Sequence, residues 1–194
     1  LGNDHLLELE HPEFTDLPNE IVFMGTLSWE ANVDGLLYFL SEVFPLVLKA
    51  DSKVKLNIVG RNPDPRIIVA SEKYPENVIL HGFVDNLKDV FRLGRVFILP
   101  LRFGSGMKVK CLDALYSGIP IATTSIGAEG IELEQNKHAL ICDNTDDFSN
   151  ALLTLLSSPE KWKAMSEESR ALARDKYTWQ AHLQETGNAL NAIF

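Results

Sequence analysis

The sequence predicts an α/β fold: a doubly wound parallel sheet with helices on both faces and a helical tail at the carboxyl end. Six short apolar runs alternate with stretches whose apolar positions recur at helical spacing, and three helical stretches close the chain. Glycine or proline follows most of the apolar runs, as is usual where a strand ends. Such alternation favours parallel β–α units, whose ligands bind outside the carboxyl ends of the strands.

The first unit is a strand followed by a long helix. An apolar run over residues 21–24 predicts the strand, and Gly25-Thr26 ends it. The helix is predicted over residues 32–49, with Asn32 as its N-cap. Pro45 should kink this helix or restart it, because proline has no N–H to donate inside a helix.

Two more strand–helix units follow. The expected elements are a strand over residues 54–59, a helix over 65–74, a strand over 78–80 and a short helix that Asp85 caps and that runs to Leu93. Gly60-Arg61 follows the first of these strands, and His81-Gly82-Phe83-Val84 follows the second. Because the carboxyl ends of parallel strands share one edge of a sheet, these turns should lie beside Gly25-Thr26.

Residues 95–123 supply the fourth and fifth strands. An apolar run over residues 96–99 predicts the fourth strand, and a loop with Gly104-Ser105-Gly106 follows it. A helical pattern comes next and is stopped by Gly118. The fifth strand, over residues 119–122, begins at once. The stretch therefore reads as strand, glycine loop, helix and strand.

The two ends of the chain differ in character. We expect a sixth strand over residues 139–142 and then three helices, over 145–156, 159–176 and 179–192. Residues 1–20 are polar and contain two prolines, so we interpret them as a linker or lead-in segment. The two cysteines, Cys111 and Cys142, lie far apart in apolar surroundings and are expected to be buried free thiols.

The glycine loop is a candidate site for an anion. It lies where the carboxyl end of a strand meets the amino end of a helix, so free N–H groups and the positive end of the helix dipole gather there. Lys108 and Lys110 fall in the first turn of that helix, where cations are unfavourable for the helix itself. Two lysines placed against the dipole predict that something negative is bound between them.

The spacing of Lys110 and Asp113 leaves two interpretations open. The two residues lie within about 60° of each other around the helix. In one interpretation Lys110 binds a phosphate and Asp113 accepts hydrogen bonds from sugar hydroxyls. In the other they form an intrahelical salt bridge on a solvated face. Arg61, which follows a strand-end glycine, is a further candidate that its position alone leaves undecided.

Composition and missing motifs argue against several function classes. A content of 45% hydrophobic and 23% charged residues is typical of a globular protein, and a net charge of −9 disfavours nucleic-acid binding. No expected strand is followed by G-x-G-x-x-G or G-x-x-x-x-G-K-[ST], and no motif indicates a metal site. No apolar stretch approaches the roughly 18 residues of a membrane span, and no signal peptide is evident. The two expected free thiols fit a reducing, cytoplasmic location.

Taken in chain order, the motifs resemble one family. From Ile21 onward the chain is similar to the carboxyl-terminal, nucleotide-sugar-binding half of a GT-B glycosyltransferase of the retaining family 4, or group 1, type. The stretches that carry the resemblance are FMGTLSWEANVDGLLYFLSEVFP, LNIVGRNP, VILHGFVDNLKDVF, FILPLRFGSGMKVKCLDALYSGIPIATT and YTWQAHLQ. The first contains a G-T/S-x-x-W-x-x-N loop, and the fourth resembles the family signature in the variant G-S/T-G-x-K/R-x-K-x-L-E-A.

The resemblance implies roles for the site residues. Lys108 and Lys110 would act catalytically by stabilising the departing diphosphate, together with the N–H groups of Ser105 to Met107. Asp113 falls where the family has the second Glu of an E-x7-E pair, which binds the donor ribose, and Ser105 stands where many members carry the first. The other expected substrate-binding residues are Gly25, Thr26, Arg61, Phe83, Val84, Gly104, Gly106 and Met107.

The chain also departs from the common family pattern. Gly25-Thr26 stands where many members have G-R, and Asp34-Gly35 stands where many have a lysine. Lys108 and Lys110 would then have to supply the positive charge for the diphosphate. The turn at Phe83 and Val84 would offer backbone groups to the base.

At the level of the whole protein, the resemblance implies transfer of a sugar from a nucleoside diphosphate sugar to an acceptor hydroxyl, with retention and without a metal or other cofactor. Residues 21–176 would form the Rossmann-like donor domain, and residues 177–194 a helix that returns to an amino-terminal acceptor domain, without which this fragment should be inactive. The implied setting is glycan or cell-envelope polysaccharide synthesis in the cytoplasm, including the inner face of the membrane.

Two other classes stay open from the sequence. One is a non-catalytic module that binds a nucleotide sugar, and the other is a flavodoxin-like interaction domain. Binding of UDP or GDP would separate the second from the rest, because a flavodoxin-like interaction domain predicts no such binding.

Overall fold

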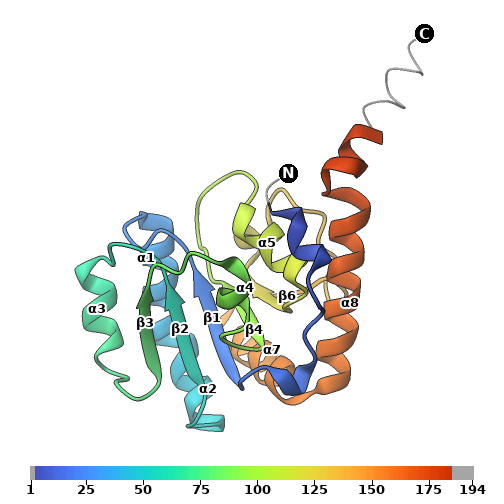
Figure 1. Ribbon diagram of the computed structural model, residues 1–194. Helices are drawn as coiled ribbons and strands as arrows, with labels where there is room; N and C mark the ends of the chain where they lie inside the picture. Colours follow the sequence, from blue (N-terminus) through green and yellow to red (C-terminus); the bar gives the residue numbers. More distant parts are fainter. Residues whose placement is uncertain (1–2, 185–194) are drawn as a thin grey trace.

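The computed structural model describes residues 3–184 and confirms the predicted parallel sheet (Figure 1). In this part of the chain six strands form one sheet in the order β3-β2-β1-β4-β5-β6, and every neighbouring pair is parallel. The strands are β1 (Glu20–Met24), β2 (Lys55–Val59), β3 (Val78–Gly82), β4 (Val96–Leu99), β5 (Ile121–Thr123) and β6 (Ala139–Ile141). The order reverses direction at β1, so the switch point lies between β1 and β4.

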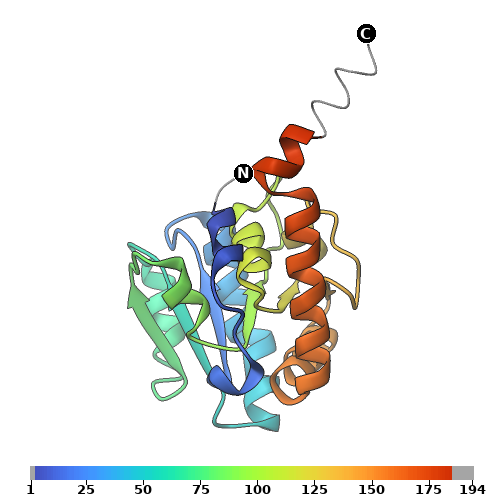
Figure 2. The same ribbon diagram turned by 45° about the vertical axis from the view of Figure 1, so that its right-hand side comes forward.

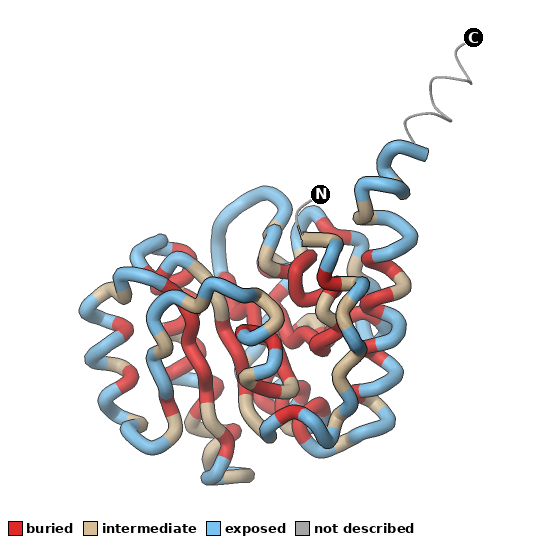
Figure 3. The backbone as a smooth tube through the Cα atoms, viewed as in Figure 1, coloured by how far each residue is buried: buried red, intermediate tan, exposed pale blue. Residues whose placement is uncertain are grey.

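Helices cover both faces of the sheet (Figure 2). The described helices are η1 (Asp4–Glu8), η2 (Phe14–Asp16), α1 (Glu30–Tyr38), η3 (Phe39–Val43), α2 (Phe44–Ala50), α3 (Pro65–Ser71), α4 (Leu87–Phe91), α5 (Val109–Ser117), α6 (Ser125–Ala128), α7 (Thr145–Ser157) and α8 (Pro159–Lys176). Ile21 and Phe23 of β1 pack with α1, α2 and α7, whereas Val22 packs with α5 and α8. Burial on both faces explains the unbroken apolar runs, and in Figure 3 the central strands are coloured as buried over most of their length.

The glycine-bearing turns meet at one edge of the sheet, as predicted. The Gly25 N–H donates to the Val59 carbonyl at 3.0 Å, and the Gly60 N–H donates to the Gly82 carbonyl at 2.8 Å. Gly60 leaves no room for a side chain, because a Cβ there would lie 2.0 Å from the Gly25 carbonyl oxygen. The turns after β1, β2 and β3 are therefore joined side by side.

The long helix after β1 is interrupted in its middle, as Pro45 predicts. α1 runs into η3, a π-helical turn in which the Phe44 N–H donates to the Phe39 carbonyl. α2 then restarts with Pro45 in its first turn. A proline has no N–H to offer the Ser41 carbonyl, and the wider turn accommodates that loss.

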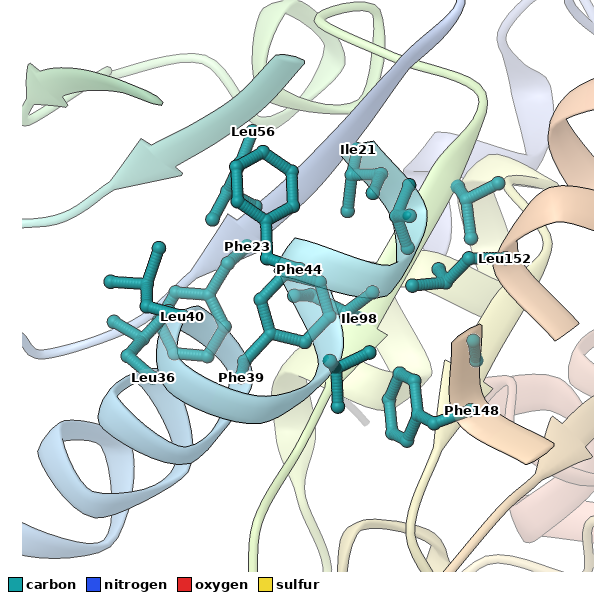
Figure 4. Packing of buried hydrophobic residues seen from close by; sticks show 14 of the residues in the cluster. Ile21, Phe23, Leu36, Phe39, Leu40, Phe44, Leu56, Ile98, Phe148 and Leu152 are labelled. Atoms are coloured by element: carbon teal, nitrogen blue, oxygen red, sulfur yellow. The ribbon is translucent and has the colours of Figure 1, made fainter. Parts of the chain in front are cut away.

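Residues 30–50 are long and apolar enough, by length and composition, to cross a membrane, which corrects our estimate of the longest apolar stretch. In the structure the apolar side of this helix packs into the core (Figure 4). The Phe39 ring lies 5.9 Å from that of Phe44 and 6.0 Å from that of Phe148, centre to centre. These side chains cover the sheet.

Some predicted element bounds were wrong for local reasons. α1 begins at Glu30, so Asn32 lies inside its first turn and is not the N-cap. The N-cap of α4 is Asn86 and not Asp85, because the Asn86 side chain accepts a hydrogen bond from the Lys88 N–H at 2.9 Å. The sequence also gave no indication of α6, which follows β5 directly.

The segment before β1, expected to be a linker, lies against the domain (Figure 2). Leu6 of η1 is buried in the cluster formed by α5 and α8. Arg170 of α8 donates to the Leu7 carbonyl at 2.6 Å, and the His11 Nε2 lies 2.8 Å from the Ser166 Oγ. The segment is therefore held by side chains of α8 as well as by apolar packing.

The carboxyl end is described only in part. Residues 179–184 are helical, as predicted, and Trp179 and Leu183 are exposed. The rest of the helix predicted over 179–192 lies outside the described residues. Its return to another domain stays a prediction.

Candidate functional site

The loop between β4 and α5 is fixed at its start and exposed in its middle. The Pro100 carbonyl lies against Gly35 of α1, where a Cβ would be 2.6 Å from the carbonyl oxygen. The Arg102 Nε donates to the Asp34 Oδ2 at 2.8 Å, and a second guanidinium nitrogen bonds the other carboxylate oxygen. Asp34 therefore anchors the loop. Residues 103–107 are exposed.

Two glycines let the exposed part of the loop turn. Gly104 has a φ of +111° and Gly106 a φ of +82°, a region that residues with side chains disfavour. Within residues 3–184, the N–H groups of residues 104–107 donate to no backbone carbonyl. The predicted donors of Ser105 to Met107 are therefore not used up by backbone pairing.

Lys108 folds back onto this loop. It is the N-cap residue of α5, and its side chain is 11% exposed. Its Nζ donates to the Gly106 carbonyl at 2.5 Å and lies 3.6 Å from a carboxylate oxygen of Glu129. The positive charge of Lys108 is thus partly compensated within the protein, and the side chain braces the loop.

Lys110 reaches the switch point between β1 and β4. Its Nζ donates to the Asn32 Oδ1 at 2.6 Å, lies 4.7 Å from the centre of the Phe23 ring, and would be 3.1 Å from a Cβ placed on Gly25. No carboxylate forms an ion pair with it in the described part of the chain. Desolvation lowers the pKa of Lys110 to about 7, and nearby Lys108 acts in the same direction.

Asp113 is buried one turn further along α5. The residue is 5% exposed, and its Oδ1 accepts a hydrogen bond from the Asn3 Nδ2 at 3.0 Å. Burial raises the pKa of this carboxyl, and the hydrogen bond from Asn3 opposes that shift. Lys110 and Asp113 contact different partners, so the salt bridge that their spacing left open is not formed.

The turns after β2 and β3 present a cation and an aromatic ring together. The Arg61 guanidinium carbon lies 3.6 Å from the centre of the Phe83 ring, and Phe83 is 53% exposed. Val84, by contrast, packs toward the cluster beneath α4 and α5. Thr26 is exposed, and its carbonyl accepts a hydrogen bond from the Asn32 Nδ2 at 2.8 Å. Arg61 and Phe83 thus lie against each other at the ends of β2 and β3.

Several contacts of the site come from residues that were not predicted to belong to it. They involve Asn3, Asn32, Arg102 and Glu129. Asn32 could have been predicted as a site residue, because it is the last residue of the G-T/S-x-x-W-x-x-N loop. Its interpretation as an N-cap obscured that role. No local sequence pattern predicts that Asn3 and Glu129 contact residues of α5 and its N-cap, because only the folded chain brings them together.

Comparison with solved structures shows the class of fold to which this chain belongs. The chain superposes on S. aureus TarM, solved in complex with Fondaparinux, alpha-GlcNAc-glycerol and UDP, with a TM-score of 0.77 and 19% identity, over 93% of this chain and 36% of that one. It also superposes on Anabaena HepE, solved with UDP and glucose, with a TM-score of 0.71 and 11% identity, over 92% and 49% of the two chains. The fold is that of the carboxyl-terminal domain of a GT-B glycosyltransferase.

The chain belongs to the glycosyl transferases group 1 family, whose model matches residues 18–158. It is 25% identical over 169 residues to an uncharacterized 44.6 kDa protein in the cps region of Klebsiella pneumoniae, covering 84% of this chain and 44% of that protein. It is 24% identical over 98 residues to a D-inositol 3-phosphate glycosyltransferase of Rhodococcus opacus (strain B4), covering 50% and 22%. The chain therefore spans less than half the length of these curated relatives.

Proposed function

We propose that this chain binds the donor of a sugar transfer, a nucleoside diphosphate sugar whose sugar passes to an acceptor hydroxyl with retention of configuration. The observation that carries this proposal is the environment of Lys110. A desolvated lysine is normally paired with an acid, yet this one has an amide and an aromatic ring as its nearest partners. An anion from outside the protein would complete the site.

A diphosphate fits the groups around Lys110. The N–H groups of residues 105–107 stand at the amino end of α5, where the helix dipole also favours negative charge. As the bond to the sugar breaks, charge grows on the departing diphosphate, and these fixed donors would stabilise it. Donors of this kind typically contribute about 10²–10³ each to the rate. Asp113 would accept the ribose hydroxyls, and the Arg61–Phe83 pair would receive the base.

The rest of the reaction would depend on an amino-terminal acceptor domain. In this scheme the departing phosphate takes the acceptor proton, so a protein base need not lie in the donor domain. The lysines of the site would supply the positive charge for the diphosphate in place of a metal. The fragment alone would bind donor without turnover. Similarity to a protein of a cps region supports a role in cell-envelope polysaccharide synthesis, which we place in the cytoplasm or at the inner face of the membrane.

Titration calorimetry with UDP, GDP, uridine and guanosine tests the donor site. At least one of the two nucleoside diphosphates is expected to bind, and its nucleoside is expected to bind at least tenfold more weakly, because most of the attraction comes from the diphosphate. The variants described below are tested with UDP, or with GDP if that is the one that binds. UDP was bound in the TarM and HepE structures. Failure of both diphosphates to bind this chain would overturn the proposal.

Replacement of Asp113 by asparagine is expected to weaken binding of UDP about tenfold, because a carboxylate accepts hydrogen bonds from both ribose hydroxyls more strongly than an amide does. Binding of 2′-deoxy-UDP should fall much less. The fold should persist: burial raises the pKa of Asp113, so ionisation of this carboxyl disfavours the folded state. Equal losses for the two nucleotides would rule out contact with the ribose.

A further inference from the structure

Asn32 connects two parts of the candidate site. It lies in the first turn of α1 and is 9% exposed. Its Oδ1 accepts from the Lys110 Nζ at 2.6 Å, and its Nδ2 donates to the Thr26 carbonyl at 2.8 Å. These two bonds fix the orientation of the amide, because a flipped amide would turn its N–H groups toward the ammonium and its oxygen toward a carbonyl.

Asn32 and Lys110 lie so close to Gly25 that a side chain at position 25 would crowd both. A Cβ on Gly25 would lie 2.8 Å from the Asn32 Nδ2 and 3.1 Å from the Lys110 Nζ. The ring of Phe23 lies 4.7 Å from the same ammonium. The end of the Lys110 side chain therefore lies among the Asn32 amide, the Phe23 ring and the backbone at Gly25, and the amide supplies its hydrogen bond.

The absence of charge on Asn32 matters as much as the shape of its side chain. The titratable groups that act on Lys110 are Lys108, which is also a cation, and the thiol of Cys111, which burial keeps protonated by raising its pKa to about 12. An aspartate at position 32 would be close in size to asparagine, but it would neutralise the lysine. An amide holds the ammonium without cancelling its charge.

We propose that Asn32 is a positioning residue for Lys110, and that an amide is required there because it fixes the ammonium while leaving its charge for the diphosphate. This inference rests on the proposed donor site. It assigns a role to the asparagine of the G-T/S-x-x-W-x-x-N loop, and it explains why Gly25 must stay small.

The test compares UDP binding by Asn32→Asp and Asn32→Leu with binding by the unaltered chain, by calorimetry between pH 6.5 and pH 9. Asn32→Asp should weaken UDP binding at least tenfold at pH 7.5, because the new carboxylate pairs with Lys110 and repels the ligand. It should also flatten the dependence of affinity on pH, because a paired Lys110 stays protonated. Asn150→Asp, on an exposed position of α7, adds the same charge elsewhere and should bind as the unaltered chain does.

Asn32→Leu keeps the inference falsifiable should the aspartate variant fail to fold. It removes both hydrogen bonds without adding charge, and it should weaken UDP binding while leaving affinity dependent on pH. UDP binding unchanged in either folded variant overturns the role of Asn32. Should Lys110→Met lose binding while Asn32→Asp keeps it, the donor site stands and the role of Asn32 alone is wrong. An unaltered chain that binds neither UDP nor GDP overturns both proposals.

Discussion

Replacement of Lys110 by methionine is expected to lower the affinity for UDP by about 10- to 100-fold, because a hydrogen bond to a charged group is worth roughly 1.5–3 kcal/mol. Methionine is similar in length and removes only the ammonium. Lys163→Met, on an exposed position of α8, is the matched control and should bind UDP normally. Calorimetry on the two variants compares them directly, and equal affinities would remove Lys110 from the site.

The same substitution should change how stability depends on pH. Desolvation lowers the pKa of Lys110 from 10.5 to about 7 in the folded chain, so between these values the unfolded chain binds more protons. The free energy of unfolding therefore rises with pH across this window, and Lys110→Met should lack that part of the rise. Urea unfolding at pH 7 and pH 9.5 measures it. An identical rise in both proteins would contradict the desolvated environment of Lys110.

Replacement of Gly60 by alanine is expected to lower the free energy of unfolding by about 3 kcal/mol or more, because overpacking against backbone cannot be relieved by a rotamer change. The new Cβ would lie 2.0 Å from the Gly25 carbonyl oxygen. Gly25 adjoins Lys110 and Asn32, so UDP binding should weaken in whatever fraction stays folded. Thermal and urea unfolding give the change in stability.

Gly82→Ala provides the comparison for Gly60→Ala. Gly82 has a φ of +69° and nothing within 4 Å of the position of a Cβ, so alanine there should cost only the roughly 1–2 kcal/mol of a left-handed backbone. A larger loss at Gly82 than at Gly60 would mean that backbone conformation, and not close packing of the strand ends, limits this edge of the sheet.

Much of the fold could be predicted from the sequence, because buried parallel strands appear as short apolar runs and helices as periodic ones. The bounds of β4 and α8 were predicted to the residue. The glycine loop and the position of Lys110 at its end were also predictable, since they follow from local order along the chain.

The partners within the site could not be predicted in the same way. Asn32 and Lys110 are 78 residues apart in sequence, and Asn3 and Asp113 are 110 apart. No local pattern encodes such pairs, and each depends on how α5 lies against α1 or η1. For the same reason, spacing alone could not decide whether Lys110 and Asp113 would pair with each other.

The π-helical turn η3 has a consequence for the length of the helix that carries Asn32. Such a turn contains one residue more than an α-helical turn, so it accommodates one extra residue in the middle of the helix. Ser41, within it, is exposed. Loss of one residue there would keep both halves in their rotational phase, so Asn32 would stay beside Lys110, but it would place Pro45 inside a regular α-helical turn. The extra residue of η3 therefore lets one helix contain Pro45 and still present Asn32 to Lys110.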